Sequence, residues 1–283
     1  MGRAEGGAVA NPIFRIYWRA VIPFLHLGPL LVPTFGLMIA VAMLAAYFVL
    51  GADMRRRRMA SKISNLPEMF IAVPCLVGLA GAKLYHVLQT PQELFAHPAE
   101  MLLSRYGLAW FGGLIAGLAA FAWLARWNKF PLLAMLDAGA PAAAIGYGVG
   151  RIGCLLSGDG DYGVPTSLPW GMSFPDGLVP TTQRVHPTPI YELIMACAIA
   201  GLLWRLGGMQ LTARREGDFP RPGAVFAAYL MLTGIARFFV EFIRINPRTI
   251  LGMTNAQAAS LVSIVVGAIL WWMLERQTAP ARD

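Results

Sequence analysis

Residues 30–50 read LLVPTFGLMIAVAMLAAYFVL and contain no charged side chain. A helix needs about 20 apolar residues to cross the hydrocarbon core of a bilayer, and this stretch is long enough. Four consecutive arginines, Arg55 to Arg58, follow a few residues later. Because the cytoplasmic loops of membrane proteins are enriched in lysine and arginine, the stretch predicts a transmembrane helix whose C-terminal end faces the cytoplasm.

The composition of the whole chain also indicates a membrane protein. Of its 283 residues, 57% are hydrophobic and 13% are charged. Soluble globular proteins carry roughly 25% charged residues, so this chain lacks the polar material for a water-facing surface. This excludes a soluble enzyme, a disordered chain and a disulfide scaffold, and it leaves a polytopic membrane protein.

The net charge and the cysteines argue against a nucleic-acid-binding protein and against a zinc site or disulfide framework. The net charge is +8, but the basic residues gather in short segments after apolar runs. That distribution is typical of cytoplasmic loops, so we expect no nucleic acid as a partner. The cysteines, Cys75, Cys154 and Cys197, are far apart and lack metal-ligand spacing. We therefore expect neither a zinc site nor a disulfide framework.

The apolar runs predict an all-α fold with about seven membrane-spanning helices, whose boundaries are accurate to a few residues. The predicted spans are residues 30–50, 67–88, 107–126, 131–153, 188–206, 223–243 and 257–275. Basic residues follow each odd-numbered span, which predicts an N-terminus outside the cell and a cytoplasmic C-terminus.

We expect residues 1–283 to form a single membrane-embedded domain. Within it, residues 1–27 form an N-terminal interfacial segment with a helix over residues 12–27, and residues 154–187 form an outward-facing loop. Glycines four residues apart, Gly113 with Gly117 and Gly146 with Gly150, predict close packing of helix backbones.

A small group of charged and polar side chains lies at the predicted outer ends of the spans. A charge at the bilayer centre costs ~2.5–3.5 kcal/mol on the insertion scale, so several of them together indicate a polar cavity. Two guanidinium groups facing one cavity suit a lipid phosphate, because their planar fork binds phosphate oxygens in pairs. The group comprises Arg151 at the end of the fourth span, His186, Tyr191 and Glu192 at the start of the fifth, and Arg237, Glu241 and Arg244 on one face of the sixth.

Simpler interpretations of these charges stay open. An arginine near a helix end can extend its charged head to the lipid headgroups, and an arginine–glutamate pair can serve only to hold helices together. These alternatives apply most to Arg244. For Arg151 and Arg237 together a functional site is favoured, because charges inside the membrane usually mark function.

The loop after the fourth span begins like a calcium-binding loop, but the pattern then fails. A calcium loop that starts at Asp159 needs a further acidic or amide side chain at position 163 and a glutamate at position 170. The chain has Gly163 and Trp170 there. We expect no metal at Asp159 and Asp161, and an ordinary turn is the alternative to a role beside Arg151.

Several motifs in fixed order resemble those of the prolipoprotein diacylglyceryl transferase family. The stretch GRIGCLLSGD at residues 150–159 is similar to the family signature G-R-x-G-N-F-x-N-G-E, which a glycine follows, here Gly163. Further matches are LPWGMSFP at 168–175, HPTPIYE at 186–192, RFFVEFIR at 237–244 and the ordered residues Thr254, Gln257 and Ser260. The segments GAKLY at 81–85 and FGG at 111–113 extend the resemblance over most of the chain.

The resemblance implies a multi-pass enzyme of the bacterial plasma (inner) membrane that acts in lipoprotein biosynthesis. Such an enzyme transfers a diacylglyceryl group from phosphatidylglycerol to the lipobox cysteine thiol of a prolipoprotein, and glycerol phosphate leaves. Its partners are therefore phosphatidylglycerol, the lipobox segment and the bilayer, and no cofactor is implied.

The resemblance also implies roles for individual residues. Arg151 and Arg237 are expected to bind the headgroup and stabilise the leaving phosphate. The other expected catalytic residues are Glu241, which orients an arginine, His186 as a candidate base, and Asp159. The other expected substrate-binding residues are Arg244, Glu192, Tyr191, Asp161, Gly163 and Cys154.

Some positions depart from the family pattern. Phe111 stands where the family often has histidine or tyrosine, and it cannot transfer a proton. Cys154 and Ser157 replace the two asparagines of the signature, and Thr233 replaces a tyrosine. The glycine after the signature is displaced by one residue, so either Asp159 or Asp161 can fill the acidic position. A divergent transferase with another acceptor and a non-catalytic lipid-binding protein or transporter are the alternative functions.

Overall fold

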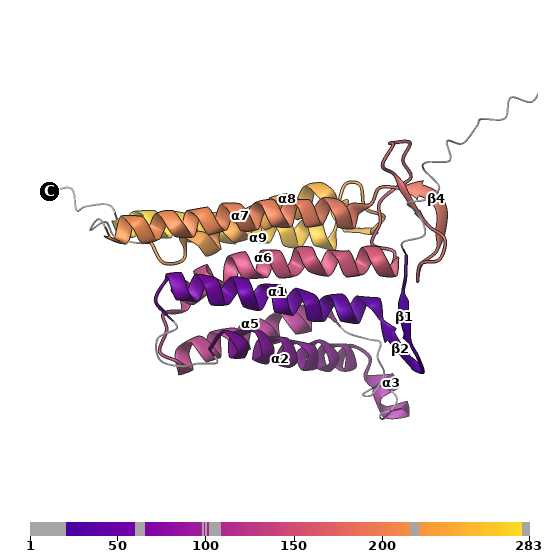
Figure 1. Ribbon diagram of the computed structural model, residues 1–283, viewed down its shortest axis with the longest axis horizontal. Helices are drawn as coiled ribbons and strands as arrows, with labels where there is room; N and C mark the ends of the chain where they lie inside the picture. Colours follow the sequence, from indigo (N-terminus) through magenta and orange to yellow (C-terminus); the bar gives the residue numbers. More distant parts are fainter. Residues whose placement is uncertain are drawn as a thin grey trace, which may run out of the picture. The chain divides into compact units, whose positions relative to one another are not determined.

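The computed structural model describes residues 21–59, 66–97, 99, 101, 109–215 and 221–278. The protein is all-helical apart from short β-hairpins (Figure 1), as the sequence predicts. The helices are α1 (Thr34–Arg56), α2 (Leu66–Gln89), α3 (Pro91–Ala96), α5 (Trp110–Trp127), α6 (Leu132–Ser157), α7 (Thr188–Arg215), α8 (Ala224–Val240) and α9 (Asn255–Thr278). Three antiparallel hairpins pair β1 (Phe24–Leu27) with β2 (Leu30–Pro33), β3 (Met172–Phe174) with β4 (Thr181–Val185), and β5 (Arg248–Ile250) with β6 (Met253–Thr254).

A helix occupies each of the seven predicted apolar segments. Five of these helices, α1, α2, α6, α7 and α9, are long and apolar enough to cross a membrane, which indicates a multi-pass membrane protein. Helices α5 and α8 are apolar but shorter. At 1.5 Å per residue, the 17 residues of α8 give about 26 Å, slightly less than the ~30 Å hydrocarbon core. That all seven cross the bilayer, with the termini on the predicted sides, stays a prediction.

The ends of three predicted elements are wrong. The first span begins at Thr34, because residues 24–33 form the β1–β2 hairpin and the Thr34 hydroxyl donates to the Ile22 carbonyl. The same hairpin replaces the end of the helix predicted over residues 12–27, whose residues 12–20 lie outside the described part of the chain. Helix α6 continues to Ser157, so the outward loop begins at residue 158 rather than 154.

The sixth helix is also shorter than predicted. Helix α8 ends at Val240, so it does not carry Arg237, Glu241 and Arg244 on one continuous helical face. Tighter turns follow, in which the amides of Ile243 and Arg244 donate to the carbonyls three residues earlier, at 3.1 and 3.4 Å. These turns keep the three charged side chains close in space although the helix has ended.

The chain divides into two compact units. The first, here called the site unit, takes residues from Met1–Ala42, Tyr147–Ala196 and Gly234–Leu261. The second, here called the core unit, takes residues from Met43–Gly146, Cys197–Thr233 and Val262–Asp283. The single domain expected over residues 1–283 stays a prediction.

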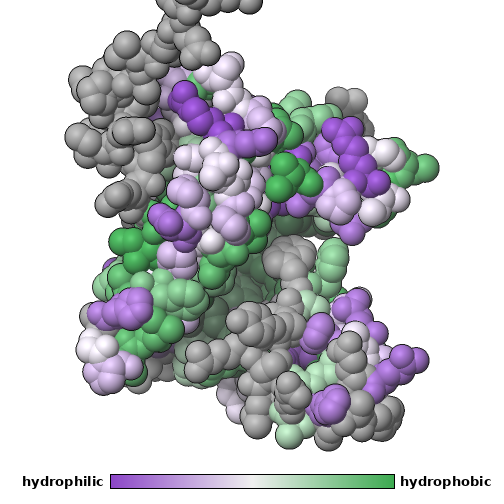
Figure 2. Space-filling view, turned by 90° about the vertical axis from the view of Figure 1, so that its right-hand side faces the viewer, coloured by the Kyte–Doolittle hydropathy of each residue, from purple (hydrophilic) through white to green (hydrophobic). Residues whose placement is uncertain are grey.

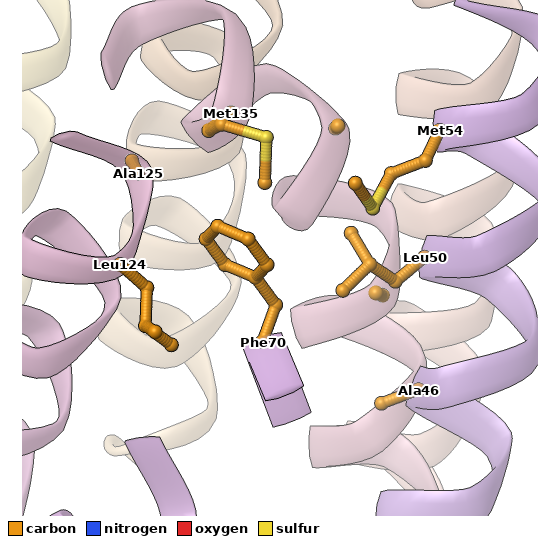
Figure 3. Close-up of a cluster of buried hydrophobic side chains, with 9 residues drawn as sticks. Ala46, Leu50, Met54, Phe70, Leu124, Ala125 and Met135 are labelled. Carbon is orange, nitrogen blue, oxygen red and sulfur yellow. The ribbon is translucent and has the colours of Figure 1, made fainter. Parts of the chain in front are cut away.

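The core unit is built around an apolar cluster centred on Phe70 of α2. Its ring lies among the side chains of Leu50, Leu124 and Met135, which come from three other helices (Figure 3). Elsewhere, large apolar side chains such as Leu76 and Val262 are exposed, and Figure 2 shows hydrophobic residues spread over the surface between hydrophilic ones. An apolar exterior of this kind suits contact with lipid chains.

A buried carboxylate of the core unit has a structural role. Asp137 of α6 accepts hydrogen bonds from the backbone amides of Gly223 and Phe226, both at 2.8 Å, and so caps the start of α8. A carboxylate at a helix N-terminus satisfies orphan amides and is favoured by the helix dipole. This charge inside the fourth predicted span therefore stabilises the fold.

Helices α2 and α5 lie side by side in the core unit (Figure 1), and glycines permit their close approach. A Cβ atom on Gly117 would lie 3.1 Å from the Pro74 carbonyl oxygen, and one on Gly113 would lie 3.3 Å from that of Gly78. The packing predicted for Gly113 and Gly117 is thus confirmed. A Cβ on Gly150 would meet only Ile39, at 3.9 Å, so this glycine is not in a tight contact.

We expect Gly81→Ala to destabilise the α2–α5 pair. The new Cβ would lie 2.3 Å from the Ala116 Cβ and 2.8 Å from the Gly112 carbonyl oxygen, so the backbones must separate, at a cost of about 1–3 kcal/mol. Gly201→Ala is the matched control, because a Cβ at this helical glycine meets nothing within 4 Å. Melting temperatures in detergent should fall for Gly81→Ala only. Equal melting temperatures for the two variants would contradict the close approach.

Candidate active site

Charged side chains from separate segments of the site unit meet in one network. Three arginines and three carboxylates take part, so their formal charges balance at neutral pH. The members are Arg151 of α6, Asp161 in the loop that follows, Glu192 near the start of α7, Arg237 in the last turn of α8, and Glu241 and Arg244 in the turns after α8.

Glu192 is the centre of this network. Its buried carboxylate contacts all three guanidinium groups. Arg237 donates a hydrogen bond to Oε1, Nη1 of Arg244 lies 3.2 Å from Oε2, and Nε of Arg151 lies 3.5 Å from Oε2. The Tyr147 hydroxyl donates to Oε1 at 2.5 Å. Glu192 therefore fixes residues from α6, α8 and the segment after α8 around one buried charge.

Asp161, rather than Asp159, contacts the arginines. Its two carboxylate oxygens accept hydrogen bonds from Arg151 and Arg244, so it forms a second bridge between them. Asp159 instead accepts a hydrogen bond from the Asp161 amide, at 3.2 Å. Of the two aspartates between which the sequence could not choose, Asp161 is the one in contact with the arginines, which favours it for the acidic position.

The pKa values of Asp159 and Asp161 are shifted in opposite directions. Burial by itself raises the pKa of Asp161, but the Arg151 and Arg244 guanidinium groups outweigh burial and hold that pKa below its ordinary value. The pKa of Asp159 is raised, first by burial and then by the neighbouring Asp161 carboxylate. Asp161 is thus the aspartate whose charged form the site stabilises.

A pH dependence of stability follows from these shifts. Because the folded pKa of Asp161 is depressed, its contribution is present above the unfolded value of about 3.9 and is lost as pH falls through the folded pKa. In melting scans from about pH 7 to pH 2.5, Asp161→Asn should lose less stability on acidification than the wild type. Asp159→Asn should lose more, because protonation of Asp159 on acidification favours the folded state. Identical slopes in all three proteins would contradict this assignment.

Glu241 forms the other end of the network. It is buried, and its Oε2 lies 3.0 Å from Nη2 of Arg237 and 3.7 Å from Nε of Arg244. The Asn246 side-chain amide donates to Oε1 at 2.5 Å. Glu241 therefore contacts two of the three arginines, and its role in orienting an arginine stays a prediction.

The three arginines differ in accessibility. The Arg237 side chain is 25% exposed and that of Arg151 is 17% exposed, whereas that of Arg244 is only 5% exposed. Arg151 and Arg237 are thus the more accessible of the three arginines. The enclosed Arg244 joins Asp161, Glu192 and Glu241, which suits a supporting role.

His186 belongs to a different hydrogen-bonded group. Its Nδ1 lies 3.2 Å from the Tyr191 hydroxyl oxygen, which accepts a hydrogen bond from Nε1 of Trp170 at 2.8 Å. Among the described residues, no ion pair or hydrogen bond joins the His186 or Tyr191 side chain to the arginines. The structure therefore places these two predicted site residues beside the charged network, not within it.

Gly163 permits close packing of the loop because it has no side chain. A Cβ there would lie 2.5 Å from the Ile243 carbonyl oxygen and 2.9 Å from the His186 Cβ. Its amide donates to the His186 carbonyl at 2.8 Å. Glycine at this position lets the loop pass between the start of α7 and the segment after α8, next to Asp161.

Cys154 is buried one helical turn after Arg151. Nη1 of Arg151 lies 3.4 Å from its sulfur, so the thiol contacts the network through this arginine. The ligand atoms of Cys154, Asp159 and Asp161 lie within 4.8 Å of one another. A cation there would compete with the Arg151 guanidinium group, which already contacts Cys154 and Asp161, so the set is poorly suited to a metal ion.

Sequence reasoning missed two residues of the network, Tyr147 and Asn246. Tyr147 precedes Arg151 by one helical turn, and this spacing was a usable signal because residues four apart share a helix face. Asn246 lies in irregular backbone after α8, where no periodicity exists. Its contact with Glu241 depends on the turns that end the helix.

Comparisons with known proteins agree with the motifs. A family model described as prolipoprotein diacylglyceryl transferase matches residues 23–273. A phosphatidylglycerol–prolipoprotein diacylglyceryl transferase of Geobacter sulfurreducens is 33% identical over 235 residues, which cover 81% of this chain and 84% of that protein. Proteins of the same name from Clostridium tetani and Paracidovorax citrulli are each 31% identical, covering 84% and 90% of this chain and 91% and 96% of their own lengths. The chain therefore belongs to the prolipoprotein diacylglyceryl transferase family and is a transferase.

Proposed function

We propose that this protein transfers the diacylglyceryl group of phosphatidylglycerol to the cysteine thiol in the lipobox of a prolipoprotein. The observation that carries the proposal is the buried network in which two partly exposed arginines, Arg151 and Arg237, are held by Glu192. Such a pair suits a phosphate ester, and the names of the relatives supply the two substrates.

The reaction is a displacement at the glycerol carbon of the lipid. The sulfur of the acceptor thiolate forms a bond to the carbon that carries the phosphate, and the carbon–oxygen bond to that phosphate breaks. The bonding electrons leave on the phosphate oxygen, and glycerol phosphate is the product. Charge thus builds up on the phosphate in the transition state, where Arg151 and Arg237 stabilise it.

The acceptor thiol must lose its proton before or during this step. A free cysteine has a pKa of ~8.5, so a base or a positive field is needed at neutral pH. His186 is our candidate for the base. Its Nδ1 lies 3.2 Å from the Tyr191 hydroxyl oxygen, and in the tautomer in which Nδ1 donates to that oxygen, Nε2 is the nitrogen that can accept the proton. Cys154 and Asp159 then border the headgroup site on the Arg151 side.

The enzyme would work in the bacterial plasma membrane, with the network at the outer face. We base this orientation on the basic segments that follow the odd-numbered spans, which favour a cytoplasmic side opposite the network. Five helices able to cross a membrane support the multi-pass arrangement.

The decisive experiment combines the purified protein, phosphatidylglycerol labelled in its acyl chains, and a lipobox peptide. We expect a thioether-linked, labelled peptide and release of glycerol phosphate. A peptide with serine in place of the lipobox cysteine is the control and should stay unlabelled. Binding of the lipid with no labelled peptide, under conditions where a known transferase works, would overturn the proposal in favour of a lipid-binding protein or transporter.

A further inference from the structure

Tyr147 holds a special place in the site unit because it contacts two members of the charged network at once. Its hydroxyl donates to Oε1 of Glu192 at 2.5 Å, and the guanidinium carbon of Arg151 lies 4.9 Å from its ring centroid. A hydrogen bond to a carboxylate is stronger than one between neutral groups, and a guanidinium group over an aromatic face gains further attraction. One side chain of α6 therefore supports both the central carboxylate and an arginine.

The Glu192 oxygen that Tyr147 contacts is also the oxygen that accepts the Arg237 hydrogen bond. Tyr147 thus acts on Arg151 through its ring and on Arg237 through Glu192. These are the two arginines that the proposed reaction needs at the phosphate. Among the described residues, Tyr147 and Arg237 are the two partners of Oε1, so without the phenol this oxygen is held by Arg237 alone and the position of Arg237 is less well fixed.

Exposure distinguishes Tyr147 from the residues that it contacts. Tyr147 is 42% exposed, whereas Glu192 is buried. A partly exposed tyrosine bonded to a buried carboxylate suits a residue that supports the network from its edge.

We propose that Tyr147 is a positioning residue that sets the geometry of Arg151 and Arg237 for the phosphate of the lipid donor. The proposal rests on the proposed function for its kinetic consequence, but its structural part concerns the two arginines alone. Loss of the Tyr147 hydroxyl should lower the turnover rate more than the affinity for the lipid. Misaligned arginines still attract an anion, but they stabilise the transition state less well.

The test compares Tyr147→Phe, which keeps the ring and removes the hydroxyl, with the wild type. We expect kcat to fall about tenfold or more while KM for phosphatidylglycerol changes less than about threefold, since the lost hydrogen bond is one to a charged group. Tyr47→Phe is the matched control. Tyr47 also donates to a glutamate, Glu68 at 3.0 Å, but it lies in the core unit, and its variant should keep the wild-type kcat.

A second measurement does not depend on activity. Phenylglyoxal modifies accessible guanidinium groups, and mass spectrometry can follow Arg151 and Arg237 separately. We expect faster modification of Arg237 in Tyr147→Phe and Tyr147→Trp, because both variants lose the hydroxyl that contacts Glu192, with unchanged rates in Tyr47→Phe. Melting temperatures identify any variant that does not fold, and the tryptophan variant, which also lacks the phenol, then takes the place of the phenylalanine variant.

The outcomes separate the two proposals. If the wild type forms no thioether product, the proposed function fails, and the phenylglyoxal rates still decide the role of Tyr147. Unchanged kcat together with unchanged modification rates in the Tyr147 variants would overturn the positioning role. A rise in KM without a fall in kcat would also overturn it, because Tyr147 would then only bind the lipid.

Discussion

Replacing Glu192 with glutamine will abolish the transferase activity. The substitution keeps the shape of the side chain but removes the one charge that contacts Arg151, Arg237 and Arg244. The balanced network then carries an excess positive charge at a buried position. Removing one partner of a buried ion pair typically costs 3–5 kcal/mol, because the other charge stays unpaired. If a comparable penalty falls on the transition state, kcat decreases by roughly a hundredfold to several thousandfold.

The measurement is the rate of thioether formation at saturating phosphatidylglycerol, together with the melting temperature. Glu68→Gln is the matched control, because Glu68 is exposed and accepts a hydrogen bond from a tyrosine in the same way. Glu192→Asp keeps the charge on a shorter side chain and should recover part of the activity. Wild-type turnover in Glu192→Gln would mean that the arginines hold their positions without this carboxylate.

The sequence predicts the helical architecture well because the signal is collective. In a chain this apolar, each run of about 20 residues between charged or proline-rich segments has one stable arrangement in lipid, a helix. The ends of the elements depend on few contacts and are predicted less well. The end of α8 at Val240 and the hairpin at residues 24–33 are set by local turns that periodicity does not encode.

In the site, too, one aspect could be predicted from the sequence and another could not: the residues involved could be predicted, but their arrangement could not. The scarce charges of this apolar chain pointed to the six residues that the structure brings together in the network. The sequence did not rank them. Glu241 has the conspicuous spacing to Arg237 and Arg244, yet Glu192, far away in the sequence, contacts one arginine more. Which carboxylate lies at the centre depends on tertiary packing.

Asp137 and Asp161 show why charge alone is an ambiguous signal. Both are acidic residues in or beside the fourth predicted span, but Asp137 caps a helix whereas Asp161 bridges two arginines. The difference lies in what approaches each carboxylate, a helix N-terminus in one case and guanidinium groups in the other. The choice between Asp159 and Asp161 likewise depends on the course of the loop.

The second large effect concerns the exposed arginines. We expect Arg237→Lys and Arg151→Lys to lose about a hundredfold to a thousandfold in kcat/KM, the range found when one preorganised transition-state donor is removed. Lysine keeps the charge but not the planar fork, so it cannot hold two acceptors in the fixed side-by-side geometry of a guanidinium group. Each arginine must do so, because Arg237 contacts Glu192 and Glu241, and Arg151 contacts Glu192 and Asp161.

Arg244 provides the internal comparison. Its guanidinium group is the most enclosed of the three and contacts all three carboxylates, so Arg244→Lys should lower the melting temperature more than either of the other variants. Arg248→Lys, at an exposed position of β5 in the same unit, should leave turnover unchanged. Steady-state kinetics with varied phosphatidylglycerol and melting scans of all four variants provide the test. If Arg151→Lys and Arg237→Lys turn over like Arg248→Lys, then fork geometry is not required and the proposed phosphate contact is wrong. If they lose turnover while keeping the wild-type melting temperature, the two exposed arginines act on the reacting lipid and the enclosed one holds the network together.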